Sequence, residues 1–364
     1  MRNTFTKLLS VLLVLLMVLS LASCAKNNDS QNSSSTDDKA SNSDASSSDA
    51  SNSDASTDDE HYVIGATFSN ETMLFFTQMQ YGFKEVVEEH GDEAIVYIYE
   101  DDAAKLADQI DQLIVKDVDF IVANIYDAKS FIPSLRKLQD AEIPIILMDF
   151  APEEEEYQKY FDAAVLNEYY QSQYNATSNL LAAFEGQEAT VGGLFLNPLN
   201  PSQIELVKGH DDAIADALTT NSQLTVLDTS YASSVSADTA LEIVTAVGQL
   251  HPDLDAYACA WYQAGLAAIN GFESVGLKVG GEDGIKLAVG DADRTLAQMV
   301  KDGTLHNIMD NDSYGIGRKG AELAYEYLEE GITHGGEKYY VEPVIYDATN
   351  VDEYIAKLDR LGLD

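Results

Sequence analysis

Basic residues, cysteines and clustered histidines are scarce in this chain of 364 residues. Lysine and arginine number 21 against 62 aspartates and glutamates, which gives a formal net charge of -41 and a pI near 4.1. Binding to a phosphate backbone depends on clustered Lys and Arg, so nucleic acid is excluded as a partner. The chain is 45% hydrophobic, which over this length is sufficient for two domains with cores of their own.

Motifs that would indicate an enzyme or a bound metal are also missing. The six histidines are scattered, and no H-E-x-x-H, G-x-S-x-G or P-loop spacing occurs. Residues 310–312, Asp-Asn-Asp, lack the spaced ligands and the distal glutamate of a calcium loop. We therefore expect neither an enzyme nor a metal site.

One glycine pattern resembles a cofactor motif. Residues 315–320, GIGRKG, match G-x-G-x-x-G between a predicted strand and a predicted helix at Ala321–Glu329. A dinucleotide site would also need an acidic ribose-binding residue at the end of the next strand, whereas a long helix and a polar loop follow here. We expect no cofactor, and we assign these glycines to close packing of a helix on the sheet.

The first 24 residues predict export. Arg2 and Lys7 lead into the apolar run Leu8–Leu21, which is short for a membrane span, and Leu-Ala-Ser-Cys follows, ending at Cys24. This ending resembles the lipobox of bacterial lipoproteins, whose cysteine becomes the lipid-bearing first residue; the alternative is an ordinary signal peptide with a chance cysteine. The resemblance implies a lipid anchor on the outer face of the cell membrane, or in the periplasm if the cell has an outer membrane. Cys259 would then have no disulfide partner, and its apolar run AYACAW predicts a buried side chain.

Residues 25–60 predict a disordered tether. They are almost wholly Ser, Asn, Asp, Ala and Thr, with no aromatic or branched aliphatic residue. Such a segment cannot bury enough apolar surface to offset the entropy lost on ordering. Its aspartates are scattered among serines without the fixed spacing of a metal site.

From Tyr62 onward, apolar segments alternate between strand and helix periodicity. In a first series we predict strands at 62–66, 94–99, 120–123 and 141–150, with helices between them. After Asp162 a second series predicts helices at 168–184, 203–218, 238–250 and 264–275, and strands at 191–196, 224–227, 256–260 and 285–289. Strands that alternate with single helices indicate right-handed crossovers, and hence two doubly wound α/β lobes with mostly parallel sheets.

Four blocks of the sequence carry a resemblance to a known family: HYVIGATFSNETMLFFTQMQYGFKEVVEEHG, VDFIVANIYDAKSFIPSLRKLQDAEIPIILMDF, HPDLDAYACAWYQAGLAAINGFESVG and IKLAVGD. Their order and spacing resemble the type I periplasmic sugar-binding proteins of ABC importers, the ribose- and galactose-binding group. The resemblance covers nearly everything from Tyr62 to the end. It implies two lobes joined by a three-segment hinge, an N-terminal lobe of 61–166 plus 312–340 and a C-terminal lobe of 167–311 plus 341–364.

An aspartate follows a predicted strand in each lobe. Residues 141–150, AEIPIILMDF, indicate a buried strand that ends in Asp149, and ligands bind beyond the carboxyl ends of strands in open α/β sheets. The resemblance places Asp149 and Asp291 at the family's ligand-binding aspartates and Asn311 at its crossing-strand amide. The alternatives are turn and helix-cap roles, of which Asp293 is an example.

Aromatic residues are expected to stack on the ligand. Phe75 and Phe76 match the family's paired phenylalanines; because Phe76 is in register with the helix core, we expect Phe75 in the cleft. The loop Ser69–Glu71 before them is longer than the family's, so their register is loose. Trp261 follows the strand AYACA, where ribose-type proteins have an asparagine, and we expect it to line the cleft, with a place in the core as the alternative.

Two departures bear on the identity of the ligand. The ribose group has arginines where this chain has Phe150 and Ile204, so two bidentate donors are lost. This argues against ribose, and we expect Phe150 to line the site. Two carboxylates with aromatic residues and no arginine suit a ligand rich in donors: another sugar, a polyol or a cationic molecule.

Together these features predict a lipid-anchored, extracytoplasmic solute-binding protein. It would capture a small polar ligand, a sugar above all, in an interlobe cleft that closes because the closed form binds more tightly. It would deliver that ligand to an ABC permease and act as a monomer. The alternative is a sensory binding protein that presents its closed state to a membrane receptor or kinase.

Overall fold

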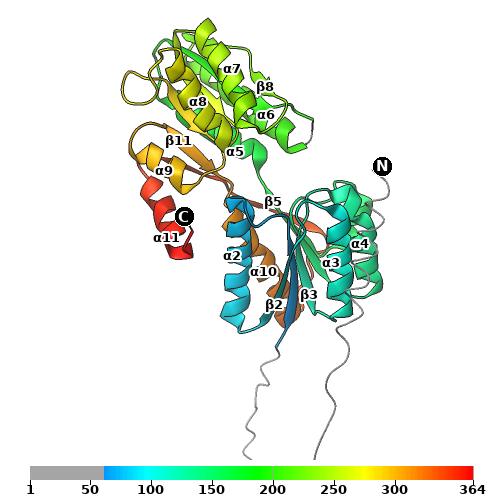
Figure 1. The fold of residues 1–364 in the computed structure, drawn as a ribbon. Coiled ribbons are helices and arrows are strands. Elements are labelled where there is room, and N and C mark those ends of the chain that lie inside the picture. The colour runs from blue at the N-terminus through cyan, green and yellow to red at the C-terminus, as the bar shows by residue number, and fades with distance from the viewer. Residues whose placement is uncertain (1–60, 200, 364) are drawn as a thin grey trace, which may run out of the picture. The chain divides into compact units, whose positions relative to one another are not determined.

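The computed structural model describes residues 61–199 and 201–363, which form two α/β sheets flanked by helices (Figure 1). The predicted signal peptide with Cys24 and the predicted tether lie outside the described residues. Within the described part, no helix is both long enough and apolar enough to cross a membrane. The prediction of two doubly wound, mostly parallel lobes is confirmed.

The first sheet has six strands, and every pairing in it is parallel. Its order is β12-β5-β4-β3-β1-β2, with bounds β1 (Val63–Phe68), β2 (Glu93–Ile98), β3 (Phe120–Asn124), β4 (Ile145–Asp149), β5 (Ala163–Asn167) and β12 (Glu337–Val341). Its helices are α2 (Leu74–His90), α3 (Ala103–Val115), α4 (Ala128–Asp140), the 3-10 helix η1 (Glu155–Tyr160) and α10 (Ser313–Glu330).

Helices cover both faces of this sheet, with α2 and α10 on one side and α3 and α4 on the other (Figure 1). Strand β3 shows why: Phe120 and Val122 belong to the core under α2 and α10, and Ile121 and Ala123 belong to the core under α3 and α4. Side chains of a strand alternate between faces, so a strand buried on both sides is a continuous apolar run.

The second sheet repeats this architecture. Its order is β13-β11-β10-β9-β6-β7, with β8 also paired to β6, and β11–β13 is its antiparallel pairing. The strands are β6 (Ala189–Leu196), β7 (Leu224–Val226), β8 (Ser230–Ala232), β9 (Leu254–Cys259), β10 (Lys286–Val289), β11 (Asn307–Asp310) and β13 (Val344–Asp347). The helices are α5 (Tyr169–Ala182), α6 (Pro201–Thr220), α7 (Ala237–Leu250), α8 (Tyr262–Ser274), α9 (Arg294–Lys301) and α11 (Val351–Leu361).

The chain passes between the sheets three times. It leaves the first sheet after β5, returns after β11 to form α10 and β12, and leaves again after β12 to form β13 and α11. Cys259 is 1% exposed at the end of β9 and is a free thiol, so its predicted burial is confirmed.

The glycine pattern at 315–320 lies inside α10, so the expectation that a helix begins only after it is wrong. A Cβ at Gly317 would lie 1.9 Å from the carbonyl oxygen of Met79 in α2, and one at Gly320 would meet Met148 and Val122 at 3.1 Å. These glycines therefore permit α10 to pack closely against α2 and the sheet, as the packing interpretation proposed.

Candidate functional site

Polar side chains gather where four neighbouring strands of the first sheet end. Ser69 follows β1, and Asn124, Asp149 and Asn167 end β3, β4 and β5. The Ser69 amide donates to Asn124 Oδ1 at 3.0 Å, and the amide groups of Asn124 and Asn167 approach Asp149 Oδ2 at 3.5 Å and Oδ1 at 2.5 Å. The carboxyl edge of this parallel sheet thus carries one connected polar network, which is where ligands bind in such folds.

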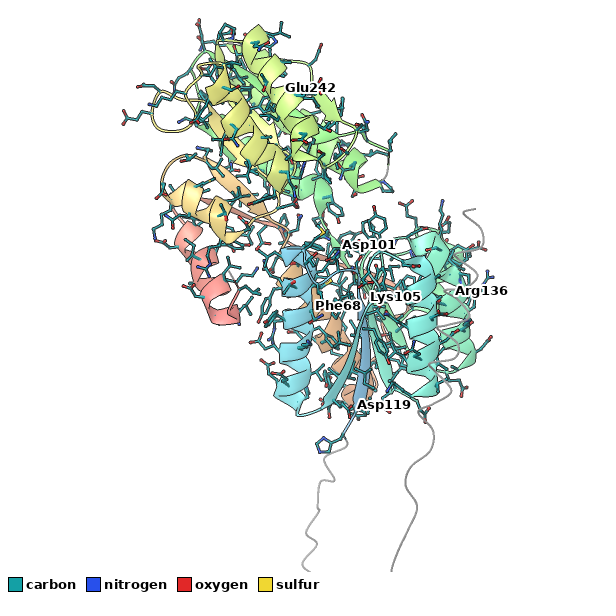
Figure 2. All side chains as sticks on the ribbon, viewed as in Figure 1. Phe68, Asp101, Lys105, Asp119, Arg136 and Glu242 are labelled. Carbon is teal, nitrogen blue, oxygen red and sulfur yellow. The ribbon has the colours of Figure 1, made fainter. Side chains whose placement is uncertain are left out.

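This network continues to the end of β2. The Ser69 hydroxyl donates to Asp101, which lies in the turn after that strand. Figure 2 shows Asp101 at this end of the first sheet and Asp119, which precedes β3, at the opposite end. The network around Asp149 therefore lies at one edge of the sheet, at the carboxyl ends of its strands.

Asp149 lies at the centre of the network. It is 6% exposed and adopts a left-handed backbone with φ of 73°, a conformation uncommon outside glycine. Its Oδ1 accepts from Asn167 and from the hydroxyl of Tyr169 at 2.9 Å, whereas among the described residues Oδ2 has only the long contact with Asn124. Burial raises the pKa of Asp149 to about 6 in spite of these donors. Oδ2 therefore retains capacity to accept another hydrogen bond.

Asn167 adds a second acceptor. Its Oδ1 is buried and has no hydrogen-bond partner among the described residues, and the residue is 7% exposed. Buried polar atoms in proteins are nearly always hydrogen-bonded. The partners of Asp149 within the described residues are two amides and a phenol, none of them basic. The edge thus offers more acceptors than donors and suits hydroxyl or ammonium groups.

Aromatic rings border this edge. Phe150 stacks on Tyr169 with ring centroids 6.2 Å apart, and it meets Tyr126 edge-on at the same distance. Tyr126 is 63% exposed, and Phe150 is half-buried. Apolar ring faces beside carboxylate and amide oxygens are the combination that a polyhydroxylated ring requires.

The second sheet also places polar side chains after its strands. Asp291 comes just after β10 with φ of 61° and accepts from the amide of Tyr262 at 3.4 Å. The loss of water around its carboxyl group raises the pKa of Asp291. The residue is exposed, so solvent weakens this effect. Asn311 follows β11, and its Oδ1 accepts from the Ser172 hydroxyl at 2.6 Å. Asp293 caps α9 by accepting from the amide of Leu296 at 2.7 Å, so its predicted cap role is confirmed.

Of the predicted aromatic residues, Phe76 and Trp261 are buried and Phe75 is half-buried. Phe76 is 9% exposed; Phe75 is half-buried, packs against the first-sheet core and meets Phe76 edge-on at 5.1 Å. Trp261 is 5% exposed in the second-sheet core, and its indole donates to the Val235 carbonyl at 3.1 Å. In this conformation Trp261 occupies the core, the alternative to lining a cleft. Its predicted contact with a ligand, like that of Phe75, stays a prediction.

Of the residues in this network only Asp149 was predicted as a site residue; Ser69, Asp101, Asn124, Asn167 and Tyr169 were not. Asn124 directly follows the predicted strand 120–123, which was the available signal. Asn167 ends β5 and Tyr169 follows it, and this five-residue strand was not among the predicted strands. Their approach to Asp149 follows from strand order, which periodicity does not reveal.

The described residues contain no group of three or more His, Cys, Asp or Glu side chains that could hold a metal ion. Two surface hollows of about 450 and 420 Å³ are lined by none of the predicted ligand residues. The candidate site is therefore defined by its side chains at the strand ends.

Solved structures share the fold. A periplasmic ribose ABC transporter protein from Conexibacter woesei has a TM-score of 0.71 at 16% identity, covering 81% of this chain and 95% of that one. An ABC transporter solute-binding protein from Actinobacillus succinogenes with bound D-allose gives 0.67 at 22%, covering 81% and 100%. One from Bacillus halodurans with bound myo-inositol gives 0.64 at 23%, covering 83% and 99%. At these identities the likeness shows the fold alone.

No curated protein sequence gives a significant match to the chain. The model of a family described as periplasmic binding protein domain matches residues 64–332, which is most of the chain. This is a family of binding proteins, which confirms the prediction that the chain is not an enzyme. The match extends from β1 to the end of α10 and so includes the strand-end network around Asp149. The chain belongs to the periplasmic binding protein domain family.

Proposed function

We propose that this chain is the solute-binding protein of an ABC sugar transporter and that it binds a sugar or a polyol between its two lobes. The lobes are 61–166 plus 312–340 and 167–311 plus 341–364. The observation that carries the proposal is the acceptor-rich edge around Asp149. There the carboxylate and Asn167 can accept from further donors, and no basic side chain of the described residues pairs with Asp149. Relatives in fold contain D-allose and myo-inositol, which are ligands of this kind.

The chemistry of the edge fits hydroxyl groups. A hydroxyl that donates to Asp149 Oδ2 makes a charge-assisted hydrogen bond, which is about twice as strong as a neutral one. Phe150 would cover the C-H face of the ring, and Asp291 and Asn311 would accept from the same ligand when the lobes close. Phe75, Phe76 and Trp261 remain candidates for stacking. Ribose is not the expected ligand, because Phe150 and the exposed Ile204 replace the family's arginines.

Delivery to a permease requires the protein to be held close to the membrane. We propose that export and lipid attachment at Cys24 hold the protein on the outer face of the cell membrane, or in the periplasm if an outer membrane is present. The chain would act as a monomer, with residues 25–60 as a tether between the lipid and the lobes.

Isothermal titration calorimetry of the mature protein against D-allose, D-fucose, D-tagatose, myo-inositol and ribose tests the site. We expect at least one of these other than ribose to bind, and we expect Asp149→Ala to weaken that binding by about tenfold or more, because a hydrogen bond to a charged group contributes roughly 1.5–3 kcal/mol. Asp108→Ala, which removes an exposed acid from α3, is the matched control.

Two results would contradict the proposal. One is that no sugar or polyol in the panel binds. The other is that a binder keeps its full affinity in Asp149→Ala, which would place the ligand elsewhere.

A further inference from the structure

Tyr354 of α11 forms hydrogen bonds to both lobes. Its ring is 0% exposed, and its hydroxyl donates to the Ala292 carbonyl at 2.6 Å. The same oxygen accepts from Gln78 Nε2 of α2 at 3.3 Å. A phenol has one donor hydrogen and free lone pairs, so both bonds form together. One atom therefore joins a helix of the first lobe to a loop of the second.

Each partner of Tyr354 lies beside a candidate ligand residue. Ala292 directly follows Asp291, and its amide donates to the Met309 carbonyl at 3.0 Å. The Tyr354 hydroxyl binds the carbonyl group of Ala292, so both backbone groups of Ala292 are held. The preceding residue, Asp291, has a left-handed backbone. Gln78 is 2% exposed and lies one helical turn after Phe75, and its Oε1 has no partner among the described residues.

Other contacts of α11 show that the helix is held where the chain crosses between the sheets. Lys357 lies one turn after Tyr354, and its ammonium is 2.8 Å from both Asp310 and Asp312, on either side of the second crossing. Arg360 donates to Glu85 of α2 at 3.2 Å. The helix is therefore placed to transmit the relative position of the lobes to the Asp291 loop.

We propose that Tyr354 is a positioning residue for ligand binding, whose hydroxyl holds the Asp291 loop in place and ties it to α2. The identity of the ligand in this inference rests on the proposed function, whereas the restraint on the loop does not depend on it. Without the hydroxyl, Asp291 would sample more orientations, and closing on a ligand would cost more entropy.

The variant Tyr354→Phe removes the hydroxyl and keeps the ring. Its matched control is Tyr346→Phe: the Tyr346 ring packs against Tyr354 with centroids 5.0 Å apart, but its hydroxyl has no hydrogen bond within the described residues. Hydrogen-deuterium exchange in the ligand-free protein measures directly how firmly the Asp291 loop is held. We expect amides in residues 290–297 to exchange about three- to tenfold faster in Tyr354→Phe and to be unchanged in Tyr346→Phe.

Calorimetry with D-allose, D-fucose, D-tagatose and myo-inositol then measures the effect on binding. We expect the affinity of whichever sugar or polyol binds to fall about three- to tenfold in Tyr354→Phe and to be unchanged in the control. Gln78→Met removes the contact with α2 and leaves the Ala292 bond, so it should weaken binding without changing exchange in 290–297. This variant also tests the coupling if Tyr354→Phe does not fold.

The outcomes separate this inference from the proposed function. Equal exchange rates in Tyr354→Phe and Tyr346→Phe would overturn it, since the ring and not the hydroxyl would then set the loop. Unchanged affinity in both Tyr354→Phe and Gln78→Met would overturn the role in binding. If no sugar or polyol of the panel binds, the proposed function fails, while the exchange measurement still decides whether the hydroxyl restrains the loop.

Discussion

Asp149 combines a buried position with a charge at neutral pH. Its hydrogen bonds from Tyr169 and Asn167 favour the carboxylate, but the loss of water around it outweighs them, and the pKa is raised to about 6. A ligand hydroxyl at Oδ2 would restore part of the lost solvation. Asp149 thus lowers the stability of the unliganded protein and would strengthen ligand binding, a combination that is common in binding sites.

The raised pKa predicts how stability depends on pH. In the unfolded chain an aspartate has a pKa near 3.9, so between about pH 4 and pH 6 the folded protein holds this proton more tightly than the unfolded one. Stability from this group is therefore present at low pH and is lost as pH rises through that window. The free energy of unfolding of Asp149→Asn minus that of wild type should therefore rise by about 3 kcal/mol between pH 3.5 and pH 7. Urea denaturation of both proteins across this range measures the difference.

The control for this measurement is Asp108→Asn, which changes an exposed acid on α3. The difference between Asp108→Asn and wild type is the baseline against which the Asp149→Asn difference is compared. A pH profile for Asp149→Asn that matches this baseline would show that Asp149 is not desolvated in the folded protein.

At the scale of elements, helices α2 and α10 approach unusually closely. Gly82 of α2 faces the backbone of Tyr314, where an added Cβ would lie 2.1 Å from the carbonyl oxygen, and Gly317 of α10 faces Met79 in the same way. Reciprocal glycines let two helix backbones approach without side chains between them. This contact fixes α10, which returns from the second sheet, against the first.

The closeness of this contact predicts the effect of one methyl group. Gly317→Ala would place Cβ 1.9 Å from backbone, so the helices must separate, and we expect a loss of roughly 1–3 kcal/mol in the free energy of unfolding. Urea denaturation checks this. Glu330→Ala at the exposed end of α10 is the control and should change stability by less than about 0.5 kcal/mol. An unchanged denaturation midpoint in Gly317→Ala would mean that the helices are further apart than described.

At the scale of the whole molecule, the chain combines a strongly acidic composition with a proposed lipid anchor. The formal net charge of -41 opposes non-specific association with anionic surfaces. Attachment to a membrane would then depend on lipid at Cys24 and on no electrostatic attraction. A single acyl chain binds weakly, so stable anchoring requires more than one chain on the modified residue.

This argument predicts the behaviour of two cysteine variants. In a bacterial host, the wild-type chain should fractionate with membranes, and Cys24→Ala should move to the soluble fraction. Cys259→Ala is the control, because that thiol is buried and unpaired, and the variant should stay with the membranes. Detergent phase partitioning and the mass of the mature N-terminus provide the measurements. A wild-type chain in the soluble fraction, or a mature N-terminus without the added mass of lipid, would exclude the lipid anchor.

Local pattern predicted the long elements of the fold. Helices were expected around Phe83, Leu135 and Val244, and these three residues of α2, α4 and α7 are buried in the cores. Four short strands, β5, β8, β12 and β13, were not predicted, although β7 and β10 are equally short and were; an apolar run of three to five residues is ambiguous by itself. Asp149 and Asp291 were expected at strand ends and are there, while their contact with a ligand remains a prediction.

The sequence by itself determined the two-lobed α/β architecture and the strand-end position of Asp149, because both depend on local periodicity and on the order of blocks along the chain. The tertiary structure decided which side chains meet. Asn124, Asn167 and Tyr169 reach Asp149 only because β5, β4 and β3 are neighbours in the sheet, and Tyr354 reaches Gln78 across 276 positions of sequence. Hydrogen bonds extend over about 3 Å in space, and separation along the chain carries no information about that distance.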